Sequence, residues 1–214
     1  MDARKIHYLN TMGIQAWQLN ASPLVSDMTD GDWEILQKQV ALCTACGLEK
    51  TRTQTVFGVG NRSAELMIIG EAPGFYEDKQ GEPFVGKAGQ LLNAMLESIH
   101  FNRDTVYIAN ILKCRPPNNR DPSAEEVNSC TPFLEKQIAL IQPKLLLAVG
   151  KIAANFLLNT TSPLGQLRNK IHTYGEKKTP LIITYHPAYL LRNPADKGKA
   201  FQDLQLTYRT LFAT

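Results

Sequence analysis

Four cysteines are the residues of this sequence best suited to hold a metal ion or an iron–sulfur cluster. Cys43 and Cys46 form a C-x2-C pair, whereas fifteen residues separate Cys114 from Cys130. A zinc ribbon needs two closely spaced pairs, so the wide second pair argues against it. Four thiolates from two distant segments suit an iron–sulfur cluster at least as well as zinc. Four unrelated buried thiols are the alternative, because free cysteine is among the most buried residue types.

A second group of chemically capable residues follows segments that we predict to be strands. Asn110 ends one such segment, and its side-chain amide can both donate and accept at the edge of a planar ring. An exposed loop asparagine is the alternative. His186 follows the last predicted strand and is fixed by Pro187, which favours a functional over a structural histidine. Glycines between Gly70 and Gly89 would let a ligand approach the backbone, although they form neither a G-x-G-x-x-G motif nor a Walker loop.

Regular elements must bring these residues together. Apolar runs predict strands at 66–69, 106–108, 144–149 and 181–185, and amphipathic spacing predicts helices at 33–40, 87–99, 123–141, 151–158 and 197–212. Ser123 and Glu126 predict a capping box at the start of one helix. Strands that alternate with helices indicate a mainly parallel sheet covered on both faces. In such sheets, ligands bind beyond the carboxyl ends of the strands.

The composition is that of a globular chain. Of its 214 residues, 43% are hydrophobic and 20% are charged, which excludes a disordered or collagen-like protein. No apolar run approaches the roughly 20 residues of a membrane span, and the N-terminus has no secretory signal, so we expect a cytoplasmic protein without membrane contact. The net charge is only +3. Basic side chains nevertheless gather between residues 165 and 199, where they could meet an anionic partner.

The motifs, taken in this order, resemble those of the type-4 (family 4) uracil-DNA glycosylases, which carry a 4Fe-4S cluster. The resemblance covers residues 40–194 and rests on Gly70-Glu71-Ala72-Pro73-Gly74 with Glu77-Asp78, the Gly81–Gly89 loop, Asn110 before Lys113-Cys114-Arg115-Pro116-Pro117, and His186–Pro194. It implies a three-layer α/β/α sandwich around a four-stranded, mainly parallel sheet. It also implies a monofunctional glycosylase of base excision repair, which flips uracil out of DNA and hydrolyses the N-glycosidic bond to leave an abasic site.

The same resemblance assigns tasks to individual residues. Glu71, near the sugar, and His186, donating to uracil O2, would be catalytic because both act on charge that develops in the transition state. Phe84 would stack on the uracil, and Asn110 would pair with its N3–H and O4 edge. Further contacts to the substrate are expected from Gly70, Ala72, Pro73 and Glu77. Leu190 would act as a wedge in the DNA, and the other residues expected to contact DNA are Arg192, Lys113 and Arg115. The 4Fe-4S cluster would be bound by Cys43, Cys46, Cys114 and Cys130.

Two positions depart from family 1 of the uracil-DNA glycosylases. Ala72 stands where family 1 has an aspartate that orients the water, which leaves Glu71, Glu77 and Asp78 as candidates for that task. Gly74 replaces the tyrosine that excludes the methyl group of thymine. Another side chain, for which Glu77 is the candidate, must then exclude thymine. We expect the cluster itself to be structural and to hold a basic loop against DNA.

Two other functions are compatible with a cluster-bearing chain of this kind. A related group binds uracil-DNA covalently through a histidine in an inserted basic loop, but the segment 115–129 is short and has no histidine. A non-catalytic iron–sulfur module that recruits replication or repair partners is the second alternative. Glu71 and His186 argue against it, because binding alone requires neither. We therefore favour an enzyme that turns over.

The first thirty residues are interpreted as an extension and linker, followed by the glycosylase domain at residues 31–214. Tyr8–Trp17 resembles the peptide by which the replicase clamp-loader psi subunit docks on chi. A first helix packed on the core is the alternative for this segment. The expected partners are thus uracil-containing DNA, single- or double-stranded, and a component of the replication machinery, with the enzyme itself a monomer.

Overall fold

The computed structural model describes residues 30–212. The fold described below is that of the unit Trp33–Thr214. The docking peptide expected at Tyr8–Trp17 lies outside the described residues. None of the helices in the described range combines the length and the apolar character needed to cross a membrane.

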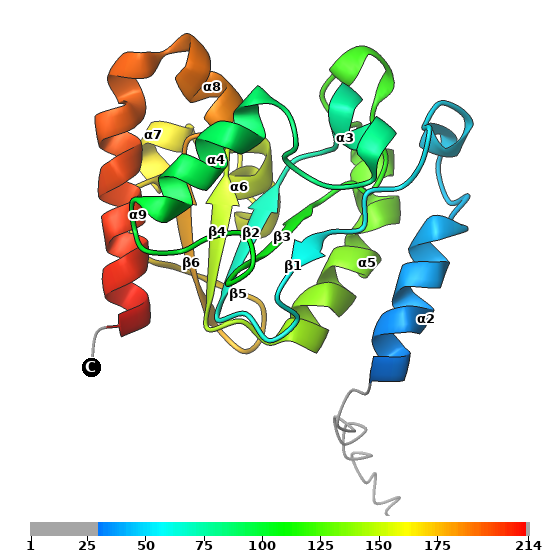
Figure 1. The fold of residues 1–214 in the computed structure, drawn as a ribbon, viewed down its shortest axis with the longest axis horizontal. Helices are drawn as coiled ribbons and strands as arrows, with labels where there is room; N and C mark the ends of the chain where they lie inside the picture. Colours follow the sequence, from blue (N-terminus) through cyan, green and yellow to red (C-terminus); the bar gives the residue numbers. More distant parts are fainter. Residues whose placement is uncertain (1–29, 213–214) are drawn as a thin grey trace, which may run out of the picture. The chain divides into compact units, whose positions relative to one another are not determined.

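A mixed sheet with the strand order β1-β3-β2-β4-β6-β5 forms the centre of the fold in the described residues (Figure 1). The inner strands run parallel to one another and are β2 (Leu66–Gly70), β3 (Tyr107–Asn110), β4 (Leu145–Val149) and β6 (Thr179–Thr184). The expected four-stranded parallel arrangement is therefore confirmed. The edge strands β1 (Val59–Gly60) and β5 (His172–Tyr174) are antiparallel to their neighbours, and their 2 and 3 residues are too short to show a strand pattern in the sequence.

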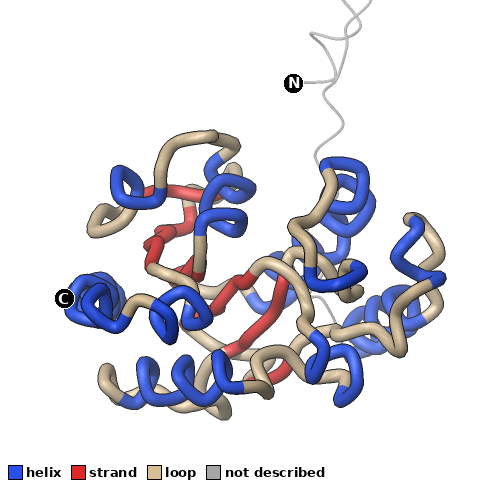
Figure 2. The backbone as a smooth tube through the Cα atoms, turned by 90° about the horizontal axis from the view of Figure 1, so that it is seen from above, coloured by secondary structure: helices blue, strands red, loops and turns tan. Residues whose placement is uncertain are grey.

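Helices cover both faces of the sheet (Figure 2), so the three-layer α/β/α prediction is confirmed. One face packs against α2 (Asp30–Ala41), α5 (Ala124–Ile141), α6 (Lys151–Leu158) and α7 (Leu164–Leu167), and the other against α4 (Lys87–Glu97), α8 (Pro187–Arg192) and α9 (Lys197–Phe212). Successive residues of β2 enter opposite layers, with Met67 and Ile69 in the first and Leu66 and Ile68 in the second. Burial on both faces explains why these strands are continuous apolar runs.

The ends of the helices follow local sequence signals to different degrees. The capping box predicted for α5 is present, since the Ser123 hydroxyl accepts from the Glu126 N–H and the Glu126 carboxylate accepts from the Ser123 N–H. By contrast, α3 (Phe75–Gln80) and α8 lie in segments that the sequence analysis treated as loops. Each is six residues long, which is too short for a helical repeat of apolar positions. Short 3-10 helices occur at Gly47–Lys50 (η1), Pro117–Asn119 (η2) and Pro194–Asp196 (η3).

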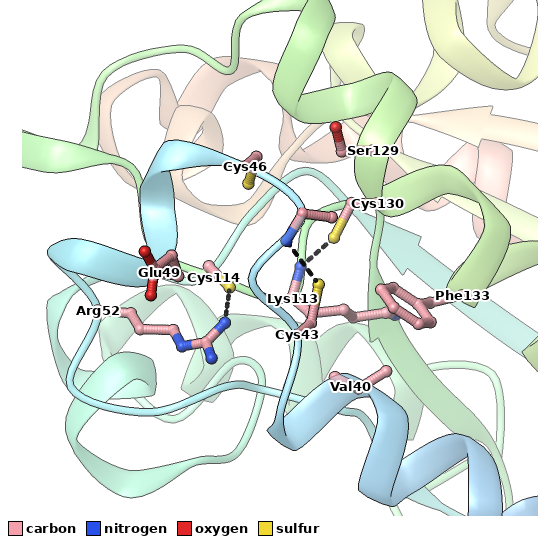
Figure 3. Close-up of a pocket in the computed structure, with 11 residues that line it drawn as sticks. Val40, Cys43, Cys46, Glu49, Arg52, Lys113, Cys114, Ser129, Cys130 and Phe133 are labelled. Atoms are coloured by element: carbon pink, nitrogen blue, oxygen red, sulfur yellow. Dashed lines mark hydrogen bonds between the residues drawn. The ribbon is translucent and has the colours of Figure 1, made fainter.

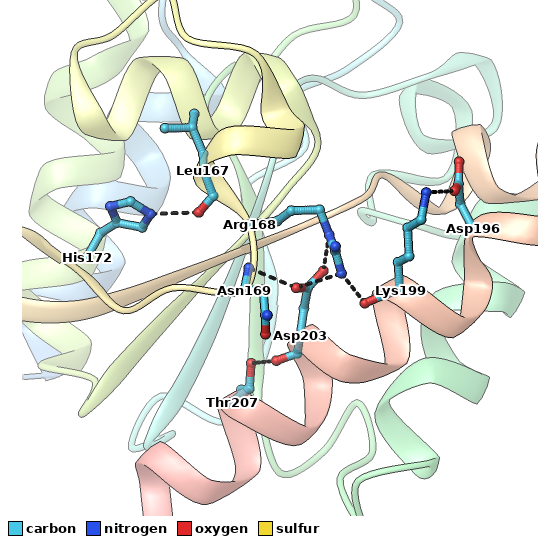
Figure 4. Close-up of polar contacts among 8 residues, drawn as sticks. All are labelled: Leu167, Arg168, Asn169, His172, Asp196, Lys199, Asp203 and Thr207. Atoms are coloured by element: carbon cyan, nitrogen blue, oxygen red, sulfur yellow. Dashed lines mark hydrogen bonds and ion pairs between the residues drawn. The ribbon is translucent and has the colours of Figure 1, made fainter.

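A polar network joins α9 to the segment after α7 (Figure 4). Two nitrogens of the Arg168 guanidinium donate to the carboxylate of Asp203, each at 3.0 Å, and Asp203 is fully buried. The guanidinium carbon also lies 5.2 Å from the centroid of the Tyr185 ring. Tyr185 stacks on Tyr189 with the ring centroids 5.1 Å apart. Because these two tyrosines flank His186 in sequence, the network supports the segment that carries this histidine.

Candidate active site

A pocket of about 460 Å³ lies beyond the carboxyl ends of β2, β3 and β6. This is where the sequence analysis expected a ligand. Six of the residues expected to act in substrate binding or catalysis line the pocket: Glu71, Ala72, Glu77, Phe84, Asn110 and His186. Arg192, which is expected to contact DNA, lines it as well. Gly70 and Pro73 are not among its lining residues. Pro73 is buried, and Gly70 pairs with Asn110 across the sheet.

Asn110 lies at the base of the pocket and depends on a glycine in the neighbouring strand. It is 2% exposed, and its Oδ1 atom has no hydrogen-bond partner among the described residues. A Cβ atom at Gly70 would lie 2.3 Å from this Oδ1 and 2.7 Å from Cζ of Phe84. Glycine at position 70 is therefore required for Asn110 and the Phe84 ring to occupy the same end of the sheet.

Phe84 is held in a backbone conformation that residues other than glycine seldom adopt. Its φ is 55°, and its ring is buried. Arg103 stabilises this turn, because its guanidinium donates to the carbonyl oxygen of Phe84 at 3.1 Å and to that of Pro83 at 2.8 Å. A Cβ at Gly89 would lie 1.7 Å from the Phe84 oxygen, so the next helix must have glycine there. The Phe84 ring faces His186 with the centroids 5.7 Å apart.

His186 is oriented by the start of α8. Its Nδ1 atom accepts a hydrogen bond of 3.1 Å from the backbone N–H of Ala188. Burial, and then the nearby charge of Arg192, lower the pKa of His186 to about 4. The ring is therefore neutral at pH 7. Since Nδ1 is an acceptor, the ring proton belongs on Nε2. His186 can thus offer one neutral N–H donor to a ligand in the pocket.

Glu71 is a carboxyl group whose protonation changes near neutral pH. Burial, followed by repulsion from Asp121, raises the pKa of Glu71 to about 7. Both residues line the pocket. The side chain is therefore divided between acid and carboxylate at pH 7, and a positive charge on a ligand would favour the carboxylate.

The other two acidic residues considered for water activation lie in different environments. The Glu77 Oε1 atom accepts from the backbone N–H groups of Val85 and Gly86, at 3.1 and 3.3 Å, and Glu77 lines the pocket. Asp78 is 2% exposed, accepts from the N–H of Thr53 at 2.9 Å and is not part of the pocket lining. Of the three acidic residues, only Glu71 and Glu77 can therefore contact a ligand there.

Lys113 does not face DNA, contrary to the expectation from the sequence. It is 1% exposed, and its ammonium group donates to the carbonyl oxygen of Asn110 at 2.8 Å and to Oε1 of Gln137 at 2.6 Å. Its position in the basic run 113–115 gave no sign of this burial. Lys113 instead supports the strand end that carries Asn110. Arg115 is partly exposed and donates to Oδ1 of Asn119 at 2.7 Å.

Leu190 is not positioned as the expected wedge. It is 1% exposed and packs in the core layer formed with α4 and α9. The neighbouring Leu191 is 45% exposed. Because the segment is a helix rather than a loop, consecutive leucines point in different directions, and only one of them can face solvent.

Three polar side chains that line the pocket, those of Asn119, Asp121 and Tyr189, were not among the site residues predicted from the sequence. Asn119 and Asp121 line it from the segment between Cys114 and α5. Asn119 has a φ of 53°, which asparagine tolerates better than most residues. The Asn118-Asn119 pair after Pro116-Pro117 is a turn signal that could have identified this segment. The pocket wall therefore begins only a few residues after one of the cysteines.

The four cysteines line one small cavity (Figure 3), although they come from distant segments. Three of the sulfur atoms accept N–H hydrogen bonds: Cys114 from the Arg52 guanidinium at 3.1 Å, Cys130 from the backbone of Lys113 at 3.2 Å, and Cys43 from the backbone of Ala45 at 3.5 Å. In the described range, no three His, Cys, Asp or Glu side chains gather closely enough to hold a single metal ion. Burial raises the pKa of the Cys114 thiol and that of Cys130, the latter to about 11.

Comparison with known proteins agrees with the fold. Residues 57–206 match the family model described as the uracil DNA glycosylase superfamily, which defines the class of the protein. The chain is 45% identical over 163 residues to the type-4 uracil-DNA glycosylase of Archaeoglobus fulgidus, covering 73% of this chain and 82% of that one. It is 44% identical over 166 residues to the type-4 enzyme of Thermotoga maritima, covering 77% and 85% respectively. The chain therefore belongs to the type-4 uracil-DNA glycosylases.

Proposed function

We propose that the pocket is where this uracil-DNA glycosylase binds and excises uracil. The carrying observation is the buried Oδ1 of Asn110, which has no partner among the described residues. A buried acceptor without a donor is costly, and a ligand that supplies an N–H group satisfies it. Uracil offers N3–H to Oδ1 and accepts at O4 from the Asn110 amide. Cytosine has an acceptor at N3 and an amino donor at C4, so it would leave both the Oδ1 acceptor and the amide donor of Asn110 unpaired.

The other side chains of the pocket fit the charge that develops when the N-glycosidic bond breaks. Negative charge grows on uracil O2, where the neutral Nε2–H of His186 can donate without first losing or gaining a proton. Positive charge grows on the sugar, where the Glu71 carboxylate stabilises it. Both interactions are stronger in the transition state than in the ground state, and therefore accelerate the reaction. Phe84 stacks on the base and keeps it in register with Asn110.

The uracil must leave the base stack before it can enter the pocket, at a cost of a few kcal/mol. We propose that Leu191 enters the vacated space and that Arg192 contacts a nearby phosphate. Both are exposed on α8, directly after the segment that positions His186. This assigns to Leu191 the task that the sequence analysis had given to Leu190.

An excision assay on a single-stranded oligonucleotide with one deoxyuridine tests the function. The wild-type protein is expected to produce alkali-labile strand breaks. Asn110→Ala, Glu71→Gln and His186→Ala should each reduce the rate about 100-fold or more. Asn155→Ala is the matched control, because Oδ1 of Asn155 is also buried, has no hydrogen-bond partner within residues 30–212 and lies outside the pocket. Absence of breaks with the wild-type protein would refute the proposed function.

We further propose that Cys43, Cys46, Cys114 and Cys130 bind a 4Fe-4S cluster. Four thiols surround one cavity, and three of their sulfurs already accept N–H hydrogen bonds, which stabilise thiolates. In such a cluster each cysteine binds a different iron, so the sulfurs need not converge on one point. The cluster would fix the segment that follows Cys114 and, with it, the pocket residues Asn119 and Asp121.

Metal analysis of anaerobically purified protein tests this assignment. The expected result is four iron atoms per chain and broad absorbance near ~400 nm. Cys130→Ser should lower the iron content and the melting temperature together. Ser129→Ala is the control, since Ser129 lines the same cavity but has no thiol. A colourless protein that contains zinc would overturn the cluster proposal without affecting the proposal for the uracil pocket.

For the N-terminal segment we propose a docking role, with residues 31–214 as the catalytic domain. The support is the similarity of Tyr8–Trp17 to a clamp-loader docking peptide. Removal of residues 1–25 is expected to abolish binding to the chi subunit while leaving excision of uracil from free oligonucleotides unchanged. Unaltered binding to chi after this deletion would overturn the proposal.

A further inference from the structure

Helix α3 presents an aromatic and basic surface beside the pocket. Phe75 is 43% exposed and Tyr76 is 59% exposed, and their rings meet edge to face with centroids 5.4 Å apart. Two cations flank Phe75: Nζ of Lys79 lies 4.8 Å and the guanidinium carbon of Arg115 lies 5.0 Å from the ring centroid. We call these four residues the α3 platform. A cluster of exposed aromatic rings is typical of a surface that binds a partner, and the two cations add cation–π contacts to it.

The acidic residues of α3 do not neutralise this surface. Glu77 is turned toward the loop that precedes α4, where it accepts from the backbone of Val85 and Gly86. Asp78 is 2% exposed and accepts from the N–H of Thr53. The outward face of the helix therefore combines aromatic rings with positive charge, a combination that suits a nucleic-acid strand.

The α3 platform is continuous with the wall of the pocket on two sides. Gly74 and Glu77, which flank the two aromatic residues in sequence, both line the pocket. On the other side, the Nε of Arg115 donates to Asn119 at 2.7 Å, and Asn119 lines the pocket as well. A nucleotide next to one whose base occupies the pocket would therefore lie within reach of Tyr76.

We propose that the α3 platform binds an unpaired base next to the flipped uracil, so that the enzyme holds single-stranded DNA at two successive nucleotides. Tyr76, the more exposed ring, stacks on that base, and Lys79 and Arg115 contact its phosphates. Stacking suits any base, because every base has a π face. In duplex DNA the neighbouring base remains paired and stacked, so the α3 platform is not used in this way. This inference rests on the proposed function of the pocket.

The first experiment compares excision from single strands and duplexes of the same sequence. Tyr76→Ala is expected to lower kcat/KM on the single strand about 5-fold or more and to leave the duplex unchanged. Tyr76→Trp should restore the rate, because tryptophan also stacks. Phe201→Ala is the control, since Phe201 is 42% exposed but belongs to α9. Equal loss on both substrates, or no loss on either, would overturn the proposal.

A second experiment identifies the base as the group that is bound. Replacing the nucleotides on both sides of the deoxyuridine by abasic analogues should slow the wild-type enzyme, and should not slow Tyr76→Ala any further. If the abasic analogues slow Tyr76→Ala by the same factor as the wild-type enzyme, the proposal is overturned. That result would indicate that the aromatic pair has another partner, such as a protein.

A third experiment measures binding of a fluorescent single strand without uracil, which does not depend on excision. Lys79→Gln should reduce the slope of log affinity against log salt concentration by about 0.7. Lys177→Gln, in the turn between β5 and β6, should leave the slope unchanged. An unaltered slope for Lys79→Gln would overturn the phosphate contact. If the wild-type protein binds this strand as expected but excises nothing, the proposed function fails while the α3 platform stands.

Discussion

The proposed role of Glu71, whose pKa is raised by burial and by Asp121, predicts that the reaction is sensitive to pH near neutrality. If the ionised form of Glu71 is required, kcat/KM should rise with pH through about 7, the pKa of this carboxyl, and level off above it. Asp121→Asn removes a negative charge that raises this pKa, so the rise should move to lower pH. Rate profiles from pH 5 to 9 check both outcomes. A Glu71→Gln variant that keeps the same rise would show that another group titrates.

Lys113 supports the backbone of Asn110, the residue that we propose recognises uracil. Lys113→Met removes two buried hydrogen bonds and leaves their acceptors unpaired, so the free energy of unfolding should fall by about 2 kcal/mol or more. Excision should be weakened as well, because Asn110 loses its support. Lys144→Met is the control, since Lys144 forms an exposed pair with Glu65 that should contribute less than ~1 kcal/mol. Urea unfolding of both variants tests the difference, and equal losses would contradict it.

Several residues of the site could be predicted from sequence, and others could not. Asn110, His186 and Glu71 follow strands, so the general rule for parallel sheets places them together. The burial of Lys113 is a property of the tertiary fold, because its partner Gln137 lies on a distant helix. No local pattern distinguishes such a lysine from an exposed one. Asp121 likewise reaches the pocket through the path of a loop.

At the scale of elements, α8 buries Leu190 and exposes Leu191, the leucine that we propose as the wedge. Leu191→Ala should lower kcat/KM on duplex DNA about 10-fold, because nothing then fills the space left by the flipped base. The loss on a single strand should be smaller, since fewer stacking contacts must be replaced. Leu190→Ala should instead destabilise the fold by about 2–5 kcal/mol, as a buried leucine does. A duplex rate unchanged in Leu191→Ala would contradict the assignment.

Besides its apolar packing, α9 is attached through the buried ion pair of Arg168 and Asp203. Asp203→Asn leaves the Arg168 guanidinium without its carboxylate, and the free energy of unfolding should fall by about 3 kcal/mol. Asp196→Asn is the control, because the Asp196–Lys199 pair lies near the surface and should contribute less than ~1 kcal/mol. Urea unfolding curves check both values. Similar curves for the two variants would show that burial does not determine how much each ion pair contributes to the free energy of unfolding.

The length of an element determined how well it could be predicted. Helices such as α5 and α9 repeat their apolar pattern often enough to be recognised, and the capping box marks the start of α5. The four inner strands are recognised as continuous apolar runs. The six residues of α3 and of α8 repeat no pattern. The expectation for Leu190 came from the family resemblance, and only the helical geometry of α8 shows that Leu190 is buried whereas Leu191 is exposed.

At the scale of the whole molecule, the cysteine cavity and the uracil pocket share one connecting segment. It begins at Cys114, carries Arg115 of the α3 platform and Asn119 and Asp121 of the pocket, and ends at the capping box of α5. A change at the cysteines should therefore alter DNA binding as well as stability. The net charge of +3 gives no indication of this arrangement, because the relevant cations are local.

The unpaired oxygen of Asn110 also has a consequence for how long different bases stay bound. This atom is buried in the folded protein, so the penalty for its dehydration belongs to folding and does not recur when a base enters. Entry should be about equally fast for any pyrimidine that reaches the pocket. A base that supplies no proton to Asn110 should leave quickly, whereas uracil should remain long enough to react. Selection would then operate through residence time rather than through the rate of entry.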